Sequence, residues 1–148
     1  MATATDTKFI PLISSSAKGP LGAAHLPRLW TKLSLGNAGL LAEGWDYCGT
    51  GFDQLTIKDL GLDMQKTLDF VKAKKPTYVQ FEEWVASNGK TDAETIRKHN
   101  DAIFGYLHGD DTCKKMQGAM GLKHEHVKDA VTLNMLEDLH ELHAQISR

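Results

Sequence analysis

Apolar residues recur at helical spacing in the second half of the chain, most clearly over residues 124–146. At about 100° per residue, one side of a helix over this stretch collects the apolar side chains Val131, Met135, Leu136, Leu139, Leu142 and Ile146. Glu137 and Glu141 fall on the opposite side. We therefore expect a C-terminal helix whose leucine stripe faces the core and whose glutamates face water.

Further helices are indicated by residues suited to a first turn or to capping. Such starts are expected at Pro27, Asp53, Asp63, Thr77 (with Gln80) and Thr91 (with Glu94). A short helix over 112–120 should end at Gly121. No stretch alternates like a strand and no hairpin turn is recognisable. The predicted fold is all-α: one compact domain of six or seven helices.

The N-terminal stretch has a different composition. Residues 1–22 are rich in Ala, Thr, Ser, Gly and Pro and show no periodicity. We expect an extended arm over 1–22 with a mobile start, whose apolar patch Phe9–Ile13 rests on the body. The helical domain should then occupy residues 23–148.

Charge and cysteine content limit the partners and the location. The 148 residues include 17 Lys and Arg against 19 Asp and Glu, a net charge of −2, which disfavours nucleic acid as a partner. No apolar run approaches the about 18 residues of a membrane span, and the N-terminal apolar patch is too short for a signal peptide. Cys48 and Cys113 are far apart and form no CxxC motif. A cytoplasmic protein with two free thiols is expected, without membrane contact.

Several catalytic and cofactor motifs are missing. The sequence has no GxxxxGK[ST] phosphate loop, no complete dinucleotide-binding GxGxxG and no GxSxG nucleophile motif. The segment from His140 to His143 is one residue short of the HExxH zinc motif. We therefore expect no cofactor.

Histidines are concentrated at the C-terminal end. Five of the seven lie in the last 41 residues, and His143 and His140 fall beside the predicted leucine stripe. An imidazole at a core boundary can act as a general acid or base near neutral pH, or can simply donate a hydrogen bond to the backbone. A metal site on these two histidines would need a third ligand, for which Asp138, Glu43 and Asp46 are the candidates.

Two further features suggest a binding site. Trp45, Asp46 and Tyr47 lie in a glycine-rich loop that could either form a pocket or plug the end of the helical bundle. His25 and Arg28 flank Pro27 at the start of the first helix, where a ligand carboxylate or phosphate could bind, with a surface ion pair as the alternative.

Parts of the sequence resemble a bacterial family of small helical domains of unknown function. The residues that carry the resemblance are Pro27-Arg28, Gly44, Phe52-Asp53-Gln54, Gly61-Leu62-Asp63 and Glu83-Trp84-Val85. It extends more weakly to Val131–Glu141 and covers roughly residues 20–143. The chain has Gly51 where the family usually has a proline, and His140 and Met135 where it tends to have acids. The resemblance implies a helical fold and a bacterial origin, but no reaction.

Three hypotheses follow. The first is a cofactor-independent enzyme of the lyase, isomerase or hydratase type acting on a small organic molecule, aromatic ones included. Its catalytic residues would be Asp46, Tyr47, His140 and His143, and its substrate would contact His25, Arg28 and Trp45. The second is a non-catalytic helical binding or protein-interaction module. The third is a histidine-ligated metal protein. An arm able to reach another subunit leaves a homo-oligomer open.

Overall fold

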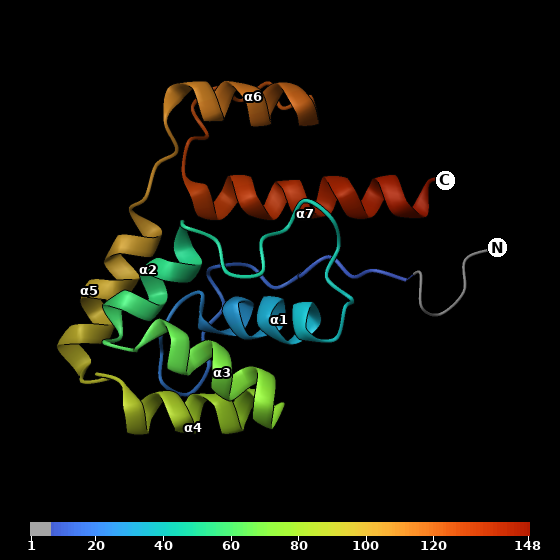
Figure 1. The fold of residues 1–148 in the computed structure, drawn as a ribbon. Helices are drawn as coiled ribbons and strands as arrows, with labels where there is room; N and C mark the ends of the chain where they lie inside the picture. Colours follow the sequence, from blue (N-terminus) through green and yellow to red (C-terminus); the bar gives the residue numbers. More distant parts are fainter. Residues whose placement is uncertain (1–6) are drawn as a thin grey trace.

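Seven α-helices form the framework of residues 7–148, the part of the chain that the computed structural model describes (Figure 1). They are α1 (Leu26–Asn37), α2 (Phe52–Asp59), α3 (Met64–Lys74), α4 (Tyr78–Asn88), α5 (Ala93–Phe104), α6 (Asp110–Met120) and α7 (Ala130–Ile146). The described residues form no β-strand and only two isolated bridges. The all-α prediction is confirmed.

Local capping explains where several helices begin. Asp63 accepts a hydrogen bond from the Lys66 N–H at the start of α3, as predicted. Thr77 and Gln80 form the predicted capping box of α4. The second predicted capping box is wrong, because Asp92 rather than Thr91 caps α5.

Asp53 does not cap α2, contrary to the prediction. The helix begins at Phe52 after Gly51, which offers no capping side chain. Asp53 lies in the first turn, and its carboxylate is 2% exposed and bonded to other segments. The residue was misassigned because its preferred partners come from α1, which the local pattern does not show.

The apolar core lies among α1 to α5. Leu26, Leu29 and Leu33 of α1 are fully buried, and they belong to the same cluster as Phe81 and Val85 of α4. α1 contacts both α3 and α4, and α2 contacts α3 and α5. One face of α1 therefore supplies the centre of the body.

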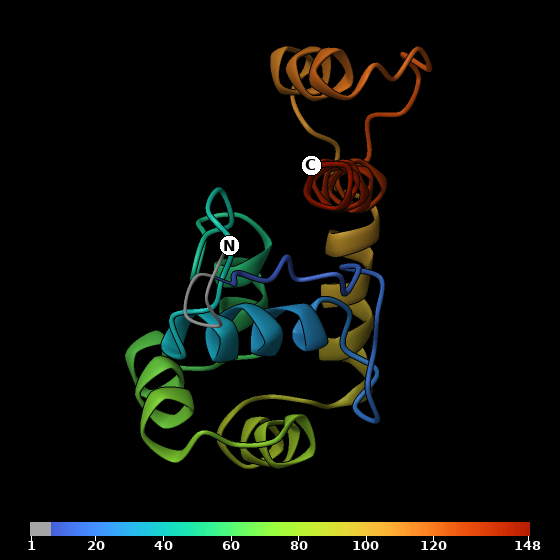
Figure 2. The same cartoon turned by 90° about the vertical axis from the view of Figure 1, so that its right-hand side faces the viewer.

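The described part of the predicted arm first runs between α1 and α7 and then turns toward α4 (Figures 1 and 2), where the Leu21 N–H donates to Glu82. Phe9 forms backbone hydrogen bonds with Leu40 and Ala42, of 2.7 and 2.9 Å. Ile10 is buried, whereas Leu12 and Ile13 are exposed, so only part of the apolar patch packs inward. Residues 1–6, the predicted mobile start, lie outside the described residues.

Helices α5 to α7 form a second part of the molecule. α5 leads away from the body, and α6 packs on the outer side of α7 (Figure 2). α7 begins at residue 130, six residues later than predicted, with Asp129 as its N-cap. His124 and His126 precede it as exposed residues of the α6–α7 connection.

The leucine stripe of α7 does not face the core, and this expectation was wrong. Leu139 is 49% exposed and Ile146 73%, while the buried residues of the helix are Ala130, Leu133 and Asp138. α7 turns Asp138 inward because Arg28 of α1 binds its carboxylate. Within the described residues, no helix combines the length and apolar character needed to cross a membrane.

Candidate functional site

A polar cavity of about 180 Å³ lies where α1, the start of α2 and α7 meet. We call it the polar cavity. Its charged and aromatic lining residues are His25, Arg28, Lys32, Trp45, Asp46, Phe52, Asp53 and Glu137, together with the amide Asn134. The polar cavity therefore lies at the junction between the body of the molecule and its C-terminal part.

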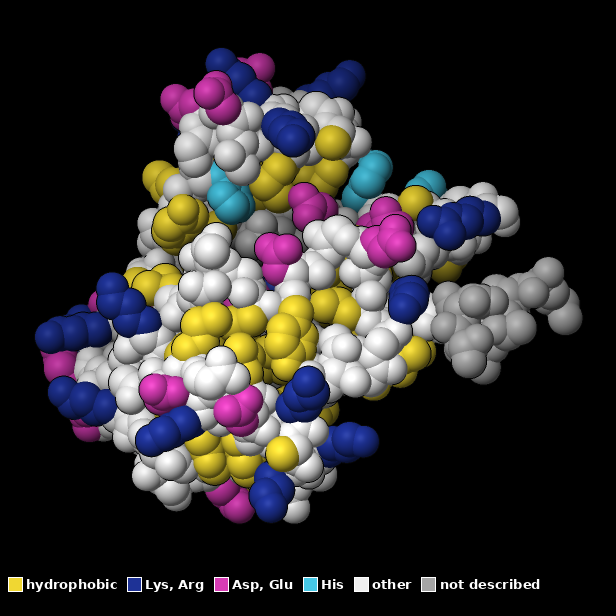
Figure 3. Space-filling model, in the orientation of Figure 1, with side chains coloured by type: hydrophobic (Ala, Val, Ile, Leu, Met, Phe, Trp, Pro, Cys, Tyr) yellow, Lys and Arg dark blue, Asp and Glu magenta, His cyan; other side chains and the backbone are white. Residues whose placement is uncertain are grey.

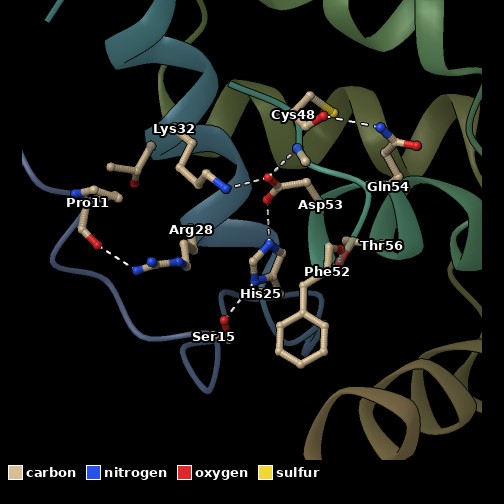
Figure 4. Close-up of polar contacts among 12 residues, drawn as sticks. Pro11, Ser15, His25, Arg28, Lys32, Cys48, Phe52, Asp53, Gln54 and Thr56 are labelled. Atoms are coloured by element: carbon tan, nitrogen blue, oxygen red, sulfur yellow. Dashed lines mark hydrogen bonds and ion pairs between the residues drawn. The ribbon is translucent and has the colours of Figure 1, made fainter. Parts of the chain in front are cut away.

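Asp53 is the central acceptor behind this cavity (Figure 4). One carboxylate oxygen bonds His25 Nε2 at 2.7 Å, and the other bonds the Lys32 ammonium and the Gly49 N–H. Burial alone would raise the pKa of Asp53, but the contacts with His25 and Lys32 outweigh it and hold the pKa below its ordinary value. The carboxylate stays ionised and keeps the Lys32 charge in place.

His25 connects this carboxylate to the N-terminal arm. Its Nδ1 lies 2.9 Å from the Ser15 hydroxyl, so both ring nitrogens have partners. Burial lowers the pKa of His25, which favours the neutral ring. A neutral ring that donates a hydrogen bond from Nε2 to Asp53 can accept a hydrogen bond from the Ser15 hydroxyl at Nδ1. His25 also has a φ of 70°, a strained conformation for a residue other than glycine. His25 therefore helps to hold the Asp53 carboxylate in position.

Arg28 of α1 binds the arm and α7 directly, and through Asp138 it is linked to the loop that carries Trp45. Its guanidinium forms two hydrogen bonds with Asp138 of α7, at 2.6 and 3.1 Å. It also donates to the carbonyls of Pro11 and Ile13 in the arm. Trp45 completes the arrangement by donating its indole N–H to Asp138 at 2.9 Å. We call this set the Arg28–Asp138 cluster.

This cluster changes the role expected for Arg28. The sequence suggested a guanidinium available to a ligand carboxylate or phosphate. In the structure Arg28 is 6% exposed and its charge is balanced by Asp138, which is 3% exposed. Arg28 therefore holds the walls of the cavity together.

Two carboxylates of the lining have no such balance. Asp46 and Glu137 take part in no ion pair or side-chain hydrogen bond within residues 7–148. Glu137 is solvent-exposed as a residue, but partial desolvation of its carboxyl and the neighbouring charge of Asp138 raise its pKa. Because Arg28 and Lys32 are each paired, the uncompensated charge of the polar cavity is negative.

An apolar cavity of about 260 Å³ adjoins the polar one and shares Gly51, Phe52 and Asn134 with it. Its remaining lining comes from α2, α7, the loop before α2 and the α5–α6 connection: Thr50, Leu55, Tyr106, His108 and Ala130. The Phe52 and Tyr106 rings meet edge to face, with centroids 5.5 Å apart. The two cavities are therefore neighbours, with Phe52 in the lining of both.

Four of the residues predicted from sequence meet at the polar cavity: His25, Arg28, Trp45 and Asp46. Tyr47 lies apart from it, with its hydroxyl donating to Asn37 Oδ1 at 2.7 Å, and burial raises the pKa of this phenol. His140 and His143 are exposed and are not among the lining residues. Figure 3 shows histidine side chains on the outer surface near α6 and α7. The loop does meet α7, but through Asp138.

Sequence reasoning missed Lys32, Asp53 and Glu137 as site residues and considered Asp138 only as a metal ligand. One signal was available, because His25, Arg28 and Lys32 have helical spacing (i, i+3, i+7) and so share a side of α1. Asp138 carried no such signal, because the predicted orientation of α7 did not turn it inward. Glu137 is exposed, as predicted, although it also lines the cavity.

The structure also bears on a metal site. Among residues 7–148, no group of three or more His, Cys, Asp or Glu side chains is arranged to hold a metal ion. Asp138, one suggested third ligand, is bonded to Arg28 and Trp45.

Comparisons of the sequence with protein-family models and with curated proteins give no match, so any assignment of function depends on the geometry of this site.

Proposed function

We propose that the protein is an enzyme that binds a small organic molecule in the polar cavity and moves protons on it without a cofactor. The observation that carries the proposal is Glu137, an unpaired carboxyl with a raised pKa, in a cavity that also holds the buried Lys32 ammonium. Elimination, isomerisation and hydration are the reaction types that such a site supports.

Glu137 is the proposed general acid and base. A carboxyl whose pKa is raised can be deprotonated to accept a proton and can return it in the same cycle. Its charged neighbours are Asp138 and Arg28, which shift its pKa in opposite directions. Asp46, the second unpaired carboxylate, is available to orient the substrate.

Lys32 supplies N–H donors that its ion pair with Asp53 holds in place. An ammonium has three N–H donors, and Asp53 accepts from it in the folded protein. If Glu137 takes a proton from a carbon beside a carbonyl, the electron pair moves to the carbonyl oxygen, and a donor held in place stabilises that charge. Return of the proton to another carbon completes an isomerisation, and departure of a β-substituent completes an elimination.

The test is a search for turnover with matched variants. Wild-type protein would be incubated with a broad set of metabolites, and product formation would be followed by mass spectrometry. Glu137→Gln should slow turnover by about 10²- to 10⁴-fold, the usual contribution of general acid–base catalysis. Glu141→Gln is the matched control, because it lies one turn further along α7 and does not line the cavity.

Two outcomes would overturn the proposal. One is full turnover by Glu137→Gln, and the other is the absence of turnover by wild type across the set. His140→Ala and His143→Ala decide between this assignment and the one suggested by sequence, since only the latter expects them to lose activity.

A protein-interaction module is the second candidate, favoured by the outward leucine stripe of α7. Met135, Leu139 and Ile146 are 38, 49 and 73% exposed. Light scattering after size exclusion and a pull-down test this candidate, and a monomer that retains no partner would contradict it. The bacterial family, the cytoplasmic location and a homo-oligomer remain proposals.

A further inference from the structure

We infer that the ligand of this site is an amphiphilic amine, with its ammonium group beside Asp46 and Glu137 and an aromatic or branched apolar group in the apolar cavity. The inference takes its location from the proposed function and adds the chemical class of the molecule.

The volumes of the two cavities indicate a ligand that occupies both. Binding pockets for small molecules usually measure about 300 to 1,000 Å³. The polar cavity of about 180 Å³ and the apolar cavity of about 260 Å³ each fall below that range. They are adjacent, since they share three lining residues, and their combined volume lies within that range. A molecule that occupies both must have two chemically different ends.

The charges that line the polar cavity favour a cationic ligand. Arg28 is neutralised by Asp138 and Lys32 by Asp53, so neither offers a full positive charge to a ligand anion. The carboxylates of Asp46 and Glu137 belong to the same lining and have no cationic partner within residues 7–148. A cationic head group is therefore favoured over a carboxylate or phosphate.

Trp45 strengthens the case for a cation. Its indole N–H is fixed by Asp138 Oδ1, which orients the ring at the lining of the polar cavity. Ammonium groups bind well against the face of a tryptophan ring. An ordered indole and two unpaired carboxylates thus supply complementary contacts.

The apolar cavity suits the other end of the ligand, its apolar group. The apolar cavity is bordered by Phe52, Leu55, Tyr106 and Ala130. An apolar cavity of about 150 Å³ is already large enough to hold benzene. The volume of about 260 Å³ here therefore accommodates an aromatic ring or a branched alkyl group.

The experiment is calorimetric titration of the full chain with three probes: 2-phenylethylamine, ethylamine and 3-phenylpropanoate. Phenylethylamine has both ends, ethylamine lacks the ring, and phenylpropanoate replaces the cation by an anion. We expect phenylethylamine to bind at least tenfold more tightly than either of the others.

Two variants assign the two ends. Asp46→Asn should weaken phenylethylamine binding at least fivefold, while Glu43→Gln, in the same loop but outside the cavity lining, should change it less than twofold. Leu55→Trp fills the apolar cavity and should abolish the advantage of phenylethylamine over ethylamine. Val79→Trp, on an exposed site of α4, should preserve that advantage. Circular dichroism establishes that each variant is folded.

The outcomes separate this inference from the proposed function. Tighter binding of phenylpropanoate, no binding of any probe, or unchanged amine binding by Asp46→Asn would each overturn the inference. Amine binding as expected without turnover of any amine would sustain it and count against the catalytic proposal. Glu137-dependent turnover of an anionic substrate would support the catalytic proposal and contradict the inference of an amine ligand.

Discussion

The two regions that meet at α1 are held together in different ways. On one side, Leu26, Leu29 and Leu33 pack into the apolar core with α3 and α4. On the other side, His25, Arg28 and Lys32 form buried polar contacts with the arm, α2 and α7. Helix α1 therefore has one face buried in the apolar core and another face that carries buried charged and polar side chains.

Both sides of α1 border open volume, so the difference between them is one of chemistry rather than of packing. On the apolar side, a cavity of about 290 Å³ is lined by Trp30 and Ser34 of α1 and by Val71 of α3, among others. Ion pairs and hydrogen bonds require fixed distances and directions, and each buried member must be satisfied. On the charged side of α1, Asp53 and Asp138 satisfy the buried polar groups. The polar cavity lies beside these contacts. The candidate site lies on the side whose cavity is lined by charged side chains.

The largest effect is expected from breaking the Arg28–Asp138 cluster. Asp138→Ala leaves the buried Arg28 without its counter-charge and should lower the free energy of unfolding by about 3–5 kcal/mol. Urea denaturation followed by circular dichroism measures it. The double variant Arg28→Met with Asp138→Leu should recover most of the loss, because no unpaired charge remains. A loss below 1 kcal/mol for the single variant would show that the cluster does not hold α7 to the body.

The second prediction concerns acid sensitivity of the charged side of α1. Burial holds the pKa of His25 below its ordinary 6.5, so below that pH the unfolded chain binds a proton that the folded protein does not. The lowered pKa of Asp53 acts in the same direction at still lower pH. Stability from these groups is therefore present at neutral pH and is lost as the pH falls. The urea midpoint of wild type should drop between pH 7.5 and 5.5.

Two variants assign this loss. His25→Asn keeps a side chain that tolerates positive φ, and it should reduce the difference between the two midpoints. His124→Asn, at an exposed position, should leave that difference as in wild type. An equal pH dependence in His25→Asn and wild type would refute the assignment to His25.

The smallest effect is expected at the outward stripe of α7. Leu139 is 49% exposed, and Leu139→Gln should change the free energy of unfolding by at most about 0.5 kcal/mol. Leu133→Ala on the same helix removes a fully buried side chain and should cost about 2–5 kcal/mol. Urea denaturation of both variants decides the orientation of α7. A larger loss for Leu139→Gln than for Leu133→Ala would support the orientation predicted from sequence.

Local sequence was informative wherever the cause of structure is local. The caps at Asp63 and Thr77 were predicted because the bonded atoms lie within three residues of each other. The glycine-rich loop with Trp45 and Asp46 was identified as a candidate pocket from its composition, and both side chains line the polar cavity. The histidines His140 and His143 were singled out by the same kind of reasoning, yet they lie on the surface.

The sequence by itself determined the helical class of the described residues, because amphipathic spacing and capping are properties of neighbouring residues. Only the tertiary structure decided which side of α7 faces inward and which charges are free. Asp138 turns toward Arg28, a residue 110 positions away, and this contact outweighs the leucine stripe on the same helix. Because a buried guanidinium must be paired, a long-range charge contact set the orientation that the periodicity alone assigned incorrectly.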